Sequence, residues 1–451
     1  MEPGSDVLLT DLYQLNMIEA FLARGETKTA VFELFVRRLP ARRGFLMAAG
    51  LEQSLKFLEE LRLAEEEIAW LRDTGRFSTR TLAYFSDLRF TGDVHAMHEG
   101  TIFFANEPIL RVTAPLPVAQ LVETRLINIL HFESLIASKA ARMVLAAPGK
   151  LLVDFGLRRA HGAEAGLLAA RASYIAGFTG TATVLAARLF GIPVFGTMAH
   201  SYIQAHDSET VAFERFAEAR PEGLVFLIDT YDTETAARKI VALAPRLEAA
   251  GIKISGVRLD SGNLVALSNS VRRIFDEGGL AHVTIFASGG LGEDELMALG
   301  KANAPIDGFG IGTSLTTSSD VPALDCAYKL QEYSGLPRRK HAPGKDTLPG
   351  RKQVWRRYRP DGRMAGDTVS LENDEQDGEA LIHLVMREGK RVSLPPTFDE
   401  IRKHAACELQ SLPVPLRELE SGATYPVQVG KALADAAAEF DSRLTEQQRE
   451  P

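Results

Sequence analysis

The stretch from Val283 to Thr313, VTIFASGGLGEDELMALGKANAPIDGFGIGT, contains the pattern that decides the fold. An apolar and β-branched run over residues 283–288 ends in glycine, a helix-like segment over 293–301 follows, and a second apolar run over 306–311 again ends in glycine. Apolar strands that alternate with helices are typical of a parallel sheet whose faces are covered by helices. The stretch therefore predicts a strand, a helix and a second, parallel strand.

The same pattern returns between about residues 150 and 315, where short apolar runs end in Gly, Asp, Ser, Thr or His. Helix-like periodicity fills several of the intervals. About seven such units predict an irregular α/β barrel, closed or nearly closed, and an open doubly wound sheet is the alternative. Barrels of this kind place their chemistry at the C-terminal ends of the strands. The expected strands are residues 151–155, 174–178, 193–196, 224–229, 254–260, 283–288 and 306–311.

The segments before and after this repeat show no complete architecture of their own. We therefore expect them to form one discontinuous α+β domain packed beside the barrel. The predicted division is 1–120 for the N-terminal part of that domain, 121–335 for the barrel that carries the active site, and 336–451 for the C-terminal part that completes the domain. The elements expected in the flanks are a helix over 10–23, strands over 30–37 and 380–386, and a helix after Val429.

The composition fits a folded protein that acts on small molecules. The 451 residues are 45% hydrophobic and 24% charged, and 51 Lys and Arg against 59 Asp and Glu give a net charge of −8. This charge comes without the basic face that binding to nucleic-acid phosphates needs, so no nucleic-acid partner is expected. The length suits two or three domains, or one large barrel with an added module.

Neither a membrane span nor export is expected. No segment offers the about 20 apolar residues that a membrane helix requires, and the chain opens with acid where a signal peptide carries base. Cys326 and Cys407 match neither a disulfide framework nor a zinc spacing, which fits a reducing compartment. These features predict a cytoplasmic protein.

Two glycine turns are the first candidates for a binding site. Ser288-Gly289-Gly290 and Gly310-Ile311-Gly312-Thr313 both follow predicted strands, and both end in small residues that expose backbone N–H groups. At the last strands of a barrel this geometry cradles a phosphate. The alternative is that the glycines only form tight turns. The turns alone do not identify the phosphate ester.

Arg258, Asp260 and His200 are the candidates for chemistry. Arg258 and Asp260 are two residues apart, so in a strand both side chains lie on one face. They are either a structural ion pair, or an anion contact and an acceptor for sugar hydroxyls. His200 follows an apolar run, where a histidine either satisfies a local hydrogen bond or performs acid–base or nucleophilic chemistry.

An aromatic residue and two guanidinium groups share one predicted strand end. Phe155, Arg158 and Arg159 in the segment DFGLRR could hold a flat anion by stacking and charge-assisted hydrogen bonds. His95 and His98 could imitate a metal-binding pair, but no third ligand lies nearby in the sequence, so no metal site is predicted.

Several segments, in this order, together resemble the nicotinate phosphoribosyltransferase family. The likeness covers most of the chain and fades after about residue 370, apart from Tyr425-Pro426-Val427. The segments are Leu9-Thr10-Asp11-Leu12-Tyr13-Gln14-Leu15, Phe32-Glu33-Leu34-Phe35-Val36-Arg37, Gln120-Leu121-Val122-Glu123-Thr124 with Asn128, Asp154-Phe155-Gly156, Gly196-Thr197-Met198-Ala199-His200, Arg258-Leu259-Asp260-Ser261-Gly262, Ser288-Gly289-Gly290 and Gly310-Ile311-Gly312-Thr313.

The resemblance implies an ATP-dependent enzyme with ligase and glycosyltransferase chemistry. Such an enzyme transfers phosphoribose from 5-phosphoribosyl 1-pyrophosphate to nicotinate, giving nicotinate mononucleotide and pyrophosphate, and thereby brings nicotinate into NAD biosynthesis. ATP would be a co-substrate that forms a transient phosphohistidine, and Mg²⁺ is expected on the pyrophosphate. The resemblance also implies a homodimer with shared active sites.

The roles of single residues follow from the same resemblance. His200 matches the histidine that ATP phosphorylates, Asp260 would hold the ribose diol, and Arg258 would lie near the pyridine and the reacting centre. Phe155 would stack on one face of the pyridine and Tyr13 of a second subunit on the other. Arg37, or Arg38, would reach the pyrophosphate across the same interface. The residues that match the cradle of the 5′-phosphate are Ser288, Gly289, Gly290, Gly310, Gly312 and Thr313.

Selection of an acid over an amide is expected in the loop that holds Thr181 and Ala182. The related nicotinamide-using enzyme has an aspartate between two threonines here, where this chain has Ala182. A carboxylate would repel nicotinate, whereas alanine leaves Arg158 or Arg258 free to attract it. We therefore expect Thr181 and Arg158 to contact the substrate. The alternative is that Ala182 is only a small residue that packs a loop.

Alternative functions stay open at this point. Within the same superfamily, the substrate could be quinolinate, with decarboxylation, or nicotinamide. From another class, a phosphate- or flavin-binding oxidoreductase barrel would also use two late glycine turns, and a catalytically inactive metabolite-binding relative would keep the same fold.

Overall fold

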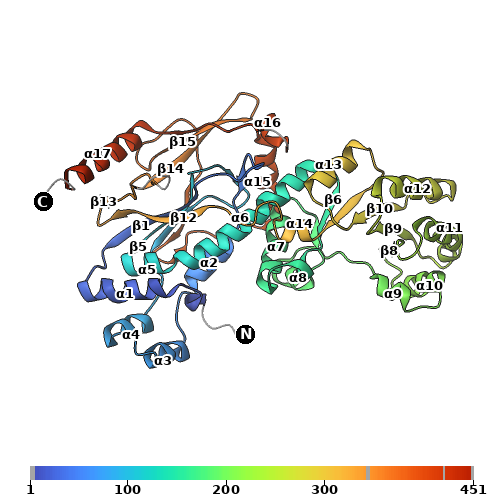
Figure 1. Cartoon of the computed structure of the whole chain (residues 1–451), viewed down its shortest axis with the longest axis horizontal. Helices are drawn as coiled ribbons and strands as arrows, with labels where there is room; N and C mark the ends of the chain where they lie inside the picture. The colour runs from blue at the N-terminus through green and yellow to red at the C-terminus, as the bar shows by residue number, and fades with distance from the viewer. Residues whose placement is uncertain (1–5, 342–345, 420–421, 448–451) are drawn as a thin grey trace. The chain divides into compact units, whose positions relative to one another are not determined.

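The structure, a computed structural model, describes residues 6–341, 346–419 and 422–447 (Figure 1). The chain divides into two compact units, and one of them is discontinuous in sequence. The inserted unit covers Lys139–Pro322, and the other combines Met1–Ser138 with Ala323–Pro451.

The inserted unit is built on a six-stranded parallel sheet with the order β7-β6-β11-β10-β9-β8. The last strand along the chain, β11, pairs with the first, β6, as the strands of a barrel do. The strands are β6 (Leu151–Asp154), β7 (Gly180–Thr181), β8 (Leu224–Leu227), β9 (Ile254–Leu259), β10 (Thr284–Ser288) and β11 (Gly308–Ile311).

Closure of this sheet into a seven-stranded barrel is not confirmed. Next to β7 there is only an isolated parallel bridge between Thr181 and Val194, where a strand over 193–196 was expected. Among the described residues no strand pairing joins this bridge to β8. The sheet therefore wraps part of the way round, and the confirmed fold class is a mixed α/β fold with one parallel sheet.

One expected strand is wrong. Residues 174–178 do not form a strand, because α7 (Ala163–Ile175) continues through the first two of them. Gly177 then takes a positive φ of 121° and ends the helical course. The strand is the short β7 that follows. A short apolar run is compatible with either a buried strand or the end of a buried helix, and here it forms the end of a helix.

Helices connect the strands of the parallel sheet. Figure 1 shows α10, α11 and α12 side by side next to β8 and β9, and α11 packs against both neighbours. The remaining bounds are η2 (Leu157–Arg159, a 3₁₀ turn), α8 (Val184–Phe190), α9 (His200–Gln204), α10 (Glu209–Ala219), α11 (Thr233–Ala249), α12 (Leu264–Glu277), α13 (Glu293–Lys301) and α14 (Thr313–Thr316).

The discontinuous unit contains a seven-stranded sheet whose members come from both ends of the chain. Its order is β13-β12-β1-β5-β3-β17-β18, and all its pairings are antiparallel. The strands are β1 (Thr29–Val36), β3 (Asp93–Ala96), β5 (Pro108–Pro115), β12 (Cys326–Tyr333), β13 (Leu336–Pro337), β17 (His383–Arg387) and β18 (Lys390–Arg391).

This pairing moves the division between the units relative to the predicted 121–335. β12 pairs with β1 from Ala30 to Val36, so residues from 323 onward group with the discontinuous unit. Residues 121–138 group there too, and α6 (Glu123–Ala146) runs across the division. Hydrogen bonds between strands distant in sequence set these limits.

Two smaller sheets complete this unit. The expected strand over 380–386 is split between the four-stranded sheet and the seven-stranded one. The strands are β14 (Lys352–Tyr358), β15 (Met364–Leu371), β16 (Glu379–Ala380) and β19 (Val427–Val429) in the four-stranded sheet, and β2 (Leu46–Met47) and β4 (Ile102–Phe103) in a two-stranded one.

The helices of this unit include both that were expected at the ends of the chain. They are η1 (Asp6–Leu8, a 3₁₀ turn), α1 (Leu12–Arg24), α2 (Leu51–Glu59), α3 (Glu65–Asp73), α4 (Thr79–Ser86), α5 (Leu116–Leu121), α15 (Phe398–Ser411), α16 (Val414–Arg417) and α17 (Lys431–Gln447). Over the described ranges, no helix has the length and apolarity needed to cross a membrane.

Candidate functional site

The candidate site lies at one edge of the parallel sheet in the inserted unit. Because the strands are parallel, their C-terminal ends meet at this edge. The register places Ser288 of β10 beside Gly310 of β11, and Ile311 beside Asp154 of β6. Both glycine turns and the Asp154–Phe155 strand end therefore lie next to one another, as the sequence predicted for strand ends.

His200, Asp260 and Ser288 come together at this edge. His200 is the first residue of α9, and its Nε2 lies 3.7 Å from Oδ2 of Asp260. The other carboxylate oxygen of Asp260 accepts a hydrogen bond from the Ser288 hydroxyl. On the opposite side of the imidazole, Nδ1 lies 3.1 Å from Oγ1 of Thr230. The His200 side chain is 38% exposed, so it remains accessible to a substrate.

Asp229 and Thr230, for which the sequence predicted no role, belong to this site. Oδ2 of Asp229 accepts hydrogen bonds from the Asp260 N–H at 3.0 Å and from the Ser261 hydroxyl at 2.6 Å. Its other oxygen is buried and has no hydrogen-bond partner among the described residues. The available signal was position, because both residues follow β8 at the end of an expected strand.

Arg258 is not paired directly with Asp260, the structural alternative that the sequence left open. Its Nη2 donates to the Met198 carbonyl at 3.0 Å, and no ion pair joins it to Asp260 over the described part of the chain. Burial lowers the pKa of the guanidinium, and the nearby Asp260 and Asp229 carboxylates oppose that shift. Its Nε is buried without a hydrogen-bond partner. A partly buried cation with an unused donor is suited to an anion.

Phe155 and Arg258 contact each other at the edge of the sheet. The guanidinium carbon lies 5.9 Å from the centre of the Phe155 ring, and the Phe286 ring centre lies 5.9 Å away on a tilted plane. Gly310 makes room for the ring, because a Cβ there would lie 2.5 Å from two ring carbons of Phe155. The arrangement offers a flat apolar surface beside a cation.

Thr181 and Ala182 lie beside the same strand end. The Thr181 hydroxyl is buried and donates to Oδ2 of Asp154 at 2.7 Å, while Oδ1 of Asp154 accepts from the Gly156 N–H at 2.8 Å. Burial raises the pKa of Asp154 against these hydrogen bonds. The Ala182 N–H donates to the Asp154 carbonyl at 2.8 Å, and the Ala182 side chain is exposed. Thr181 thus holds the loop, and Ala182 faces solvent beside it.

The turn after β10 depends on its glycines. Gly289 has a φ of +91°, and a Cβ there would lie 2.1 Å from the Asp260 carbonyl oxygen. Gly290 also has a positive φ, of +67°, but a Cβ there would have open space. The second turn leads into α14, whose first residue, Thr313, is exposed. Arg158 in η2 is exposed as well, with no side-chain partner among the described residues.

Two predicted residues, Tyr13 and Arg37, lie in the discontinuous unit. Tyr13 is in α1 and is 49% exposed, and burial of part of the side chain with nearby Glu123 raises the pKa of its phenol. Arg37 follows β1, and its Nη1 donates to Oδ1 of Asp325 at 2.8 Å. Arg38 donates to the other oxygen of Asp325 at 3.2 Å.

Arg37 and Arg38 line a cavity that no single sequence motif predicted. Its volume is about 510 Å³, and Arg42, Arg43 and Tyr425 also line it. Four guanidinium groups around one cavity favour an anion. Tyr425 lies in Tyr425-Pro426-Val427, the segment of the family resemblance that comes after residue 370. Arg37 ends the N-terminal segment Phe32-Glu33-Leu34-Phe35-Val36-Arg37. Residues of both segments therefore line this cavity.

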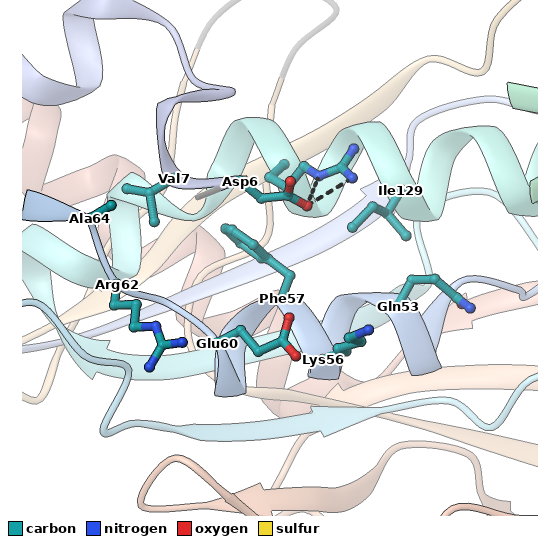
Figure 2. A pocket seen from close by; sticks show the side chains of 10 residues that line it. Asp6, Val7, Gln53, Lys56, Phe57, Glu60, Arg62, Ala64 and Ile129 are labelled. Atoms are coloured by element: carbon teal, nitrogen blue, oxygen red, sulfur yellow. Dashed lines mark hydrogen bonds and ion pairs between the residues drawn. The ribbon is translucent and has the colours of Figure 1, made fainter. Parts of the chain in front are cut away.

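A second cavity of the discontinuous unit, of about 670 Å³, contains none of the predicted site residues. Figure 2 shows its lining side chains, among them Phe57, Lys56 and Glu60 from α2 and the residue after it. Arg125 on α6 forms an ion pair with Asp6 at 3.0 Å on one wall. None of the residues of the candidate site therefore lines this cavity.

The fold and this edge define a class: an α/β protein with polar strand ends suited to an anionic substrate. Comparisons with known proteins are more specific. Three family models match the chain: the nicotinate phosphoribosyltransferase N-terminal domain over residues 8–131, the nicotinate phosphoribosyltransferase family over 151–335, and the nicotinate phosphoribosyltransferase C-terminal domain over 375–437.

Individual relatives agree with these matches. The chain is 47% identical to nicotinate phosphoribosyltransferase pncB2 of Mycobacterium tuberculosis, over 96% of this chain and 93% of the relative. It is 39% identical to nicotinate phosphoribosyltransferase of Bacillus subtilis, over 84% of this chain and 78% of that relative. The crystal structure of human nicotinic acid phosphoribosyltransferase superposes with a TM-score of 0.86 at 28% identity, covering 96% of this chain and 99% of that one.

A further solved structure is described as nicotinate-nucleotide pyrophosphorylase from Pyrococcus furiosus. It superposes with a TM-score of 0.74 at 27% identity and covers 91% of this chain and 97% of that one. The chain belongs to the nicotinate phosphoribosyltransferase family, which confirms the resemblance found in the sequence.

Proposed function

We propose that this chain transfers phosphoribose from 5-phosphoribosyl 1-pyrophosphate to nicotinate in NAD biosynthesis, and that ATP drives the transfer through phosphorylated His200. Family membership supports the transfer. The observation that carries the proposed mechanism is the accessible imidazole of His200, 3.7 Å from Asp260, at the edge that also bears both glycine turns.

The proposed coupling step is a phosphoryl transfer to the imidazole. A ring nitrogen of His200 attacks the γ-phosphorus of ATP, a P–N bond forms, and the bond between this phosphorus and the β–γ bridging oxygen breaks to release ADP. Hydrolysis of phosphohistidine later restores the neutral ring and releases phosphate. Thr230 and Asp260 flank the ring on its two sides, so both adjoin the reacting group.

In the transfer step the C1′–O bond to pyrophosphate breaks and a bond from the pyridine nitrogen to C1′ forms. The ribose develops positive charge at C1′, so an adjacent carboxylate is favourable. Asp260 supplies that carboxylate, with one oxygen held by Ser288. Phe155 and Arg258 would receive the pyridine ring and its carboxylate, because they combine an aromatic face with a partly buried cation.

Mg²⁺ is the ion that we propose for the pyrophosphate. It commonly uses only one or two protein carboxylates and takes other oxygens from phosphates and water. Within the described ranges there is no group of three or more His, Cys, Asp and Glu side chains that could hold a metal ion. The buried, unpartnered Oδ1 of Asp229 is an oxygen donor of the right chemistry. Magnesium would neutralise charge on the leaving group.

A homodimer with shared sites is the second part of the proposal. Tyr13 is half exposed, and the cavity at Arg37 and Arg38 collects guanidinium groups that suit a pyrophosphate. Both features lie in the unit that does not contain His200. We propose that a partner subunit's Tyr13 and Arg37 complete each site. A cytoplasmic location remains a prediction from the sequence.

The dimer is tested by mixing two inactive variants. Tyr13→Ala and His200→Ala subunits should each be inactive or strongly impaired alone, and their mixture should regain part of the activity through hybrid dimers with one intact site. Sedimentation gives the size of the active species. An active monomer would contradict the shared site.

Labelling with γ-phosphate-labelled ATP tests the phosphohistidine. We expect acid-labile, base-stable label on the wild-type protein and none on His200→Ala. The matched control is His206→Ala, because His206 also carries an imidazole close to His200 in the sequence, and its Nδ1 donates a hydrogen bond to the Tyr202 carbonyl at 2.8 Å. Equal labelling of His200→Ala and wild type would refute the assignment.

Substrate choice is tested by assaying nicotinate, nicotinamide and quinolinate, each with and without ATP. Product formation from nicotinate that rises with ATP is the expected result. Carbon dioxide release from quinolinate, or a preference for nicotinamide, would favour one of the two related activities. No pyrophosphate release with any combination would indicate an inactive relative.

A further inference from the structure

The imidazole of His200 has few contacts to fix its orientation. It begins the short helix α9, and its N-cap residue, Ala199, provides no side-chain cap. Its Nε2 lies 3.7 Å from Asp260, which is too far for a hydrogen bond. The contact between Nδ1 and the Thr230 hydroxyl, at 3.1 Å, is therefore the one hydrogen bond of the ring within the described ranges.

Orientation matters because a histidine ring has two nearly equivalent positions. Rotation by half a turn about the bond to the ring exchanges Nδ1 with a carbon and Nε2 with another carbon, and such terminal torsions are broad and roughly two-fold. In one position a nitrogen faces Thr230 and the other faces Asp260. In the other position, C–H groups take both places. Charge from Asp260 favours the first position strongly only when the imidazole is protonated.

Thr230 itself is held from both sides. The preceding residue, Asp229, accepts hydrogen bonds from the Asp260 N–H and the Ser261 hydroxyl. Two residues after Thr230, Asp232 caps α11 by accepting from the Thr235 N–H at 2.8 Å. The backbone around Thr230 is thus tied to the end of β9 and to the start of α11, so its hydroxyl is presented at a fixed place.

We propose that Thr230 is a positioning residue that selects the orientation of the His200 ring in which a nitrogen faces the reacting phosphoryl group. The inference rests on the proposed phosphorylation of His200. Without the hydroxyl the ring divides between two positions and two tautomers, of which only part can react. A hydrogen bond of ordinary strength corresponds to about a 3- to 10-fold slower phosphorylation when it is removed.

The experiment compares Thr230→Val with Thr230→Ser in the full-length protein. Valine keeps the shape of threonine without its hydroxyl, whereas serine keeps the hydroxyl. Single-turnover labelling of His200 by γ-phosphate-labelled ATP should be about 3- to 10-fold slower in Thr230→Val and within about twofold of wild type in Thr230→Ser. The KM for nicotinate should change less than kcat in the valine variant, because Thr230 acts on the ring and not on the pyridine.

Further measurements separate positioning from folding. The thermal midpoint of each variant shows whether a slower labelling rate accompanies a loss of stability. Thr230→Ala, which also lacks the hydroxyl, shows whether the slower rate accompanies the loss of that group. Wild-type labelling rates in Thr230→Val would overturn the proposal, and so would equal losses in the valine and serine variants. If wild-type protein takes up no label at all, the phosphohistidine itself is wrong, and Thr230 has no such reaction to position.

Discussion

At the scale of single residues, the site combines side chains of three kinds. His200 and Asp260 carry reactive groups, Arg258 and Phe155 offer a cation and a flat apolar face, and Asp229 holds the Asp260 backbone. Asp229 resembles a purely structural residue, because its carboxylate accepts a hydrogen bond from the backbone that follows a neighbouring strand. Here the second carboxylate oxygen of Asp229 is buried and has no hydrogen-bond partner among the described residues, so it is available to a ligand.

Ala182 gives a prediction about substrate charge. Its backbone N–H is bonded to the Asp154 carbonyl and its methyl group is exposed, so a larger side chain fits at this position. We expect kcat/KM for nicotinate to exceed that for nicotinamide by at least about a hundredfold, since an unsatisfied buried polar group commonly costs about 1 to 3 kcal/mol and charge adds to this. Ala182→Asp should narrow the ratio mainly by impairing nicotinate use.

The measurement is steady-state kinetics on both substrates, with Ala182→Asn as the control of similar size without charge. If the aspartate variant keeps the wild-type ratio, discrimination resides in Arg158 or Arg258 and not in this loop. Comparable wild-type activity on both substrates would contradict the charge argument altogether.

At the scale of elements, the parallel strands bring their ends together and short turns shape the edge. The turn after β10 is the tightest example, because Gly289 approaches the Asp260 carbonyl that follows β9. A side chain at this position would press on backbone, which cannot yield as a flexible side chain can. A displacement of this turn would therefore also displace Asp260, which carries the proposed ribose-binding carboxylate.

Gly289→Ala should impair use of 5-phosphoribosyl 1-pyrophosphate. The added Cβ would meet the Asp260 carbonyl oxygen at 2.1 Å, and the positive φ adds strain, so the turn or Asp260 must move. Strain of this kind costs about 1 to 3 kcal/mol, so we expect kcat/KM for this substrate to fall by about tenfold or more.

Gly290→Ala is the matched control for this prediction. It also has a positive φ, but its Cβ would have open space. The effect of Gly290→Ala on the same kcat/KM should therefore be clearly smaller. Equal effects in the two variants would show that φ alone, and not the approach to Asp260, decides the turn.

At the scale of the molecule, the discontinuous unit contains a cluster of buried charges. Arg356 is fully buried and pairs with Asp367 at 2.7 Å and with Glu408 at 2.8 Å. Glu107 lies in the same cluster and accepts from the Phe104 N–H at 2.8 Å. Burial, followed by the charge of Asp367, raises the pKa of Glu107 well above its usual range, against the effect of Arg356.

The raised pKa of Glu107 predicts a dependence of stability on pH. Because the folded state binds this proton more tightly than the unfolded state, the contribution is fully present below the usual glutamate range and is lost as pH rises through the folded pKa. Glu107→Gln keeps a neutral group of the same shape, so this variant does not lose stability through ionisation of residue 107 as pH rises. We expect its thermal midpoint to exceed that of wild type by about 2 °C or more at pH 8, and by less at pH 5.

Thermal unfolding at the two pH values is the measurement, and Glu60→Gln, at an exposed position after α2, is the control that should show no such difference. A midpoint of Glu107→Gln that is lower than wild type at pH 8 would mean that the ionised carboxylate is needed by Arg356.

The sequence by itself determined most strands of the parallel sheet, where most of them end, and that polar residues gather at those ends. It also determined the family, since the motifs occur in order and the comparisons agree. Such features are local: period, strand length and glycine turns are visible within a few residues. There are two exceptions. The expected strand at 174–178 overlaps the end of a helix, because a short apolar run lacks a distinctive hydrophobic period. The expected strand at 193–196 forms only an isolated bridge.

Only the tertiary structure decided which ends meet and what holds them. The pairing of β11 with β6, the insertion of β12 beside β1, and the contact of Thr230 with His200 join residues that are at least 30 apart in the chain. No local pattern encodes such partners, because a hydroxyl or carboxylate has the same chemistry whether it faces solvent or a ring nitrogen. The physical reason is that hydrogen-bond partners are selected by the packing of whole strands and helices, which fixes distances that the sequence leaves open.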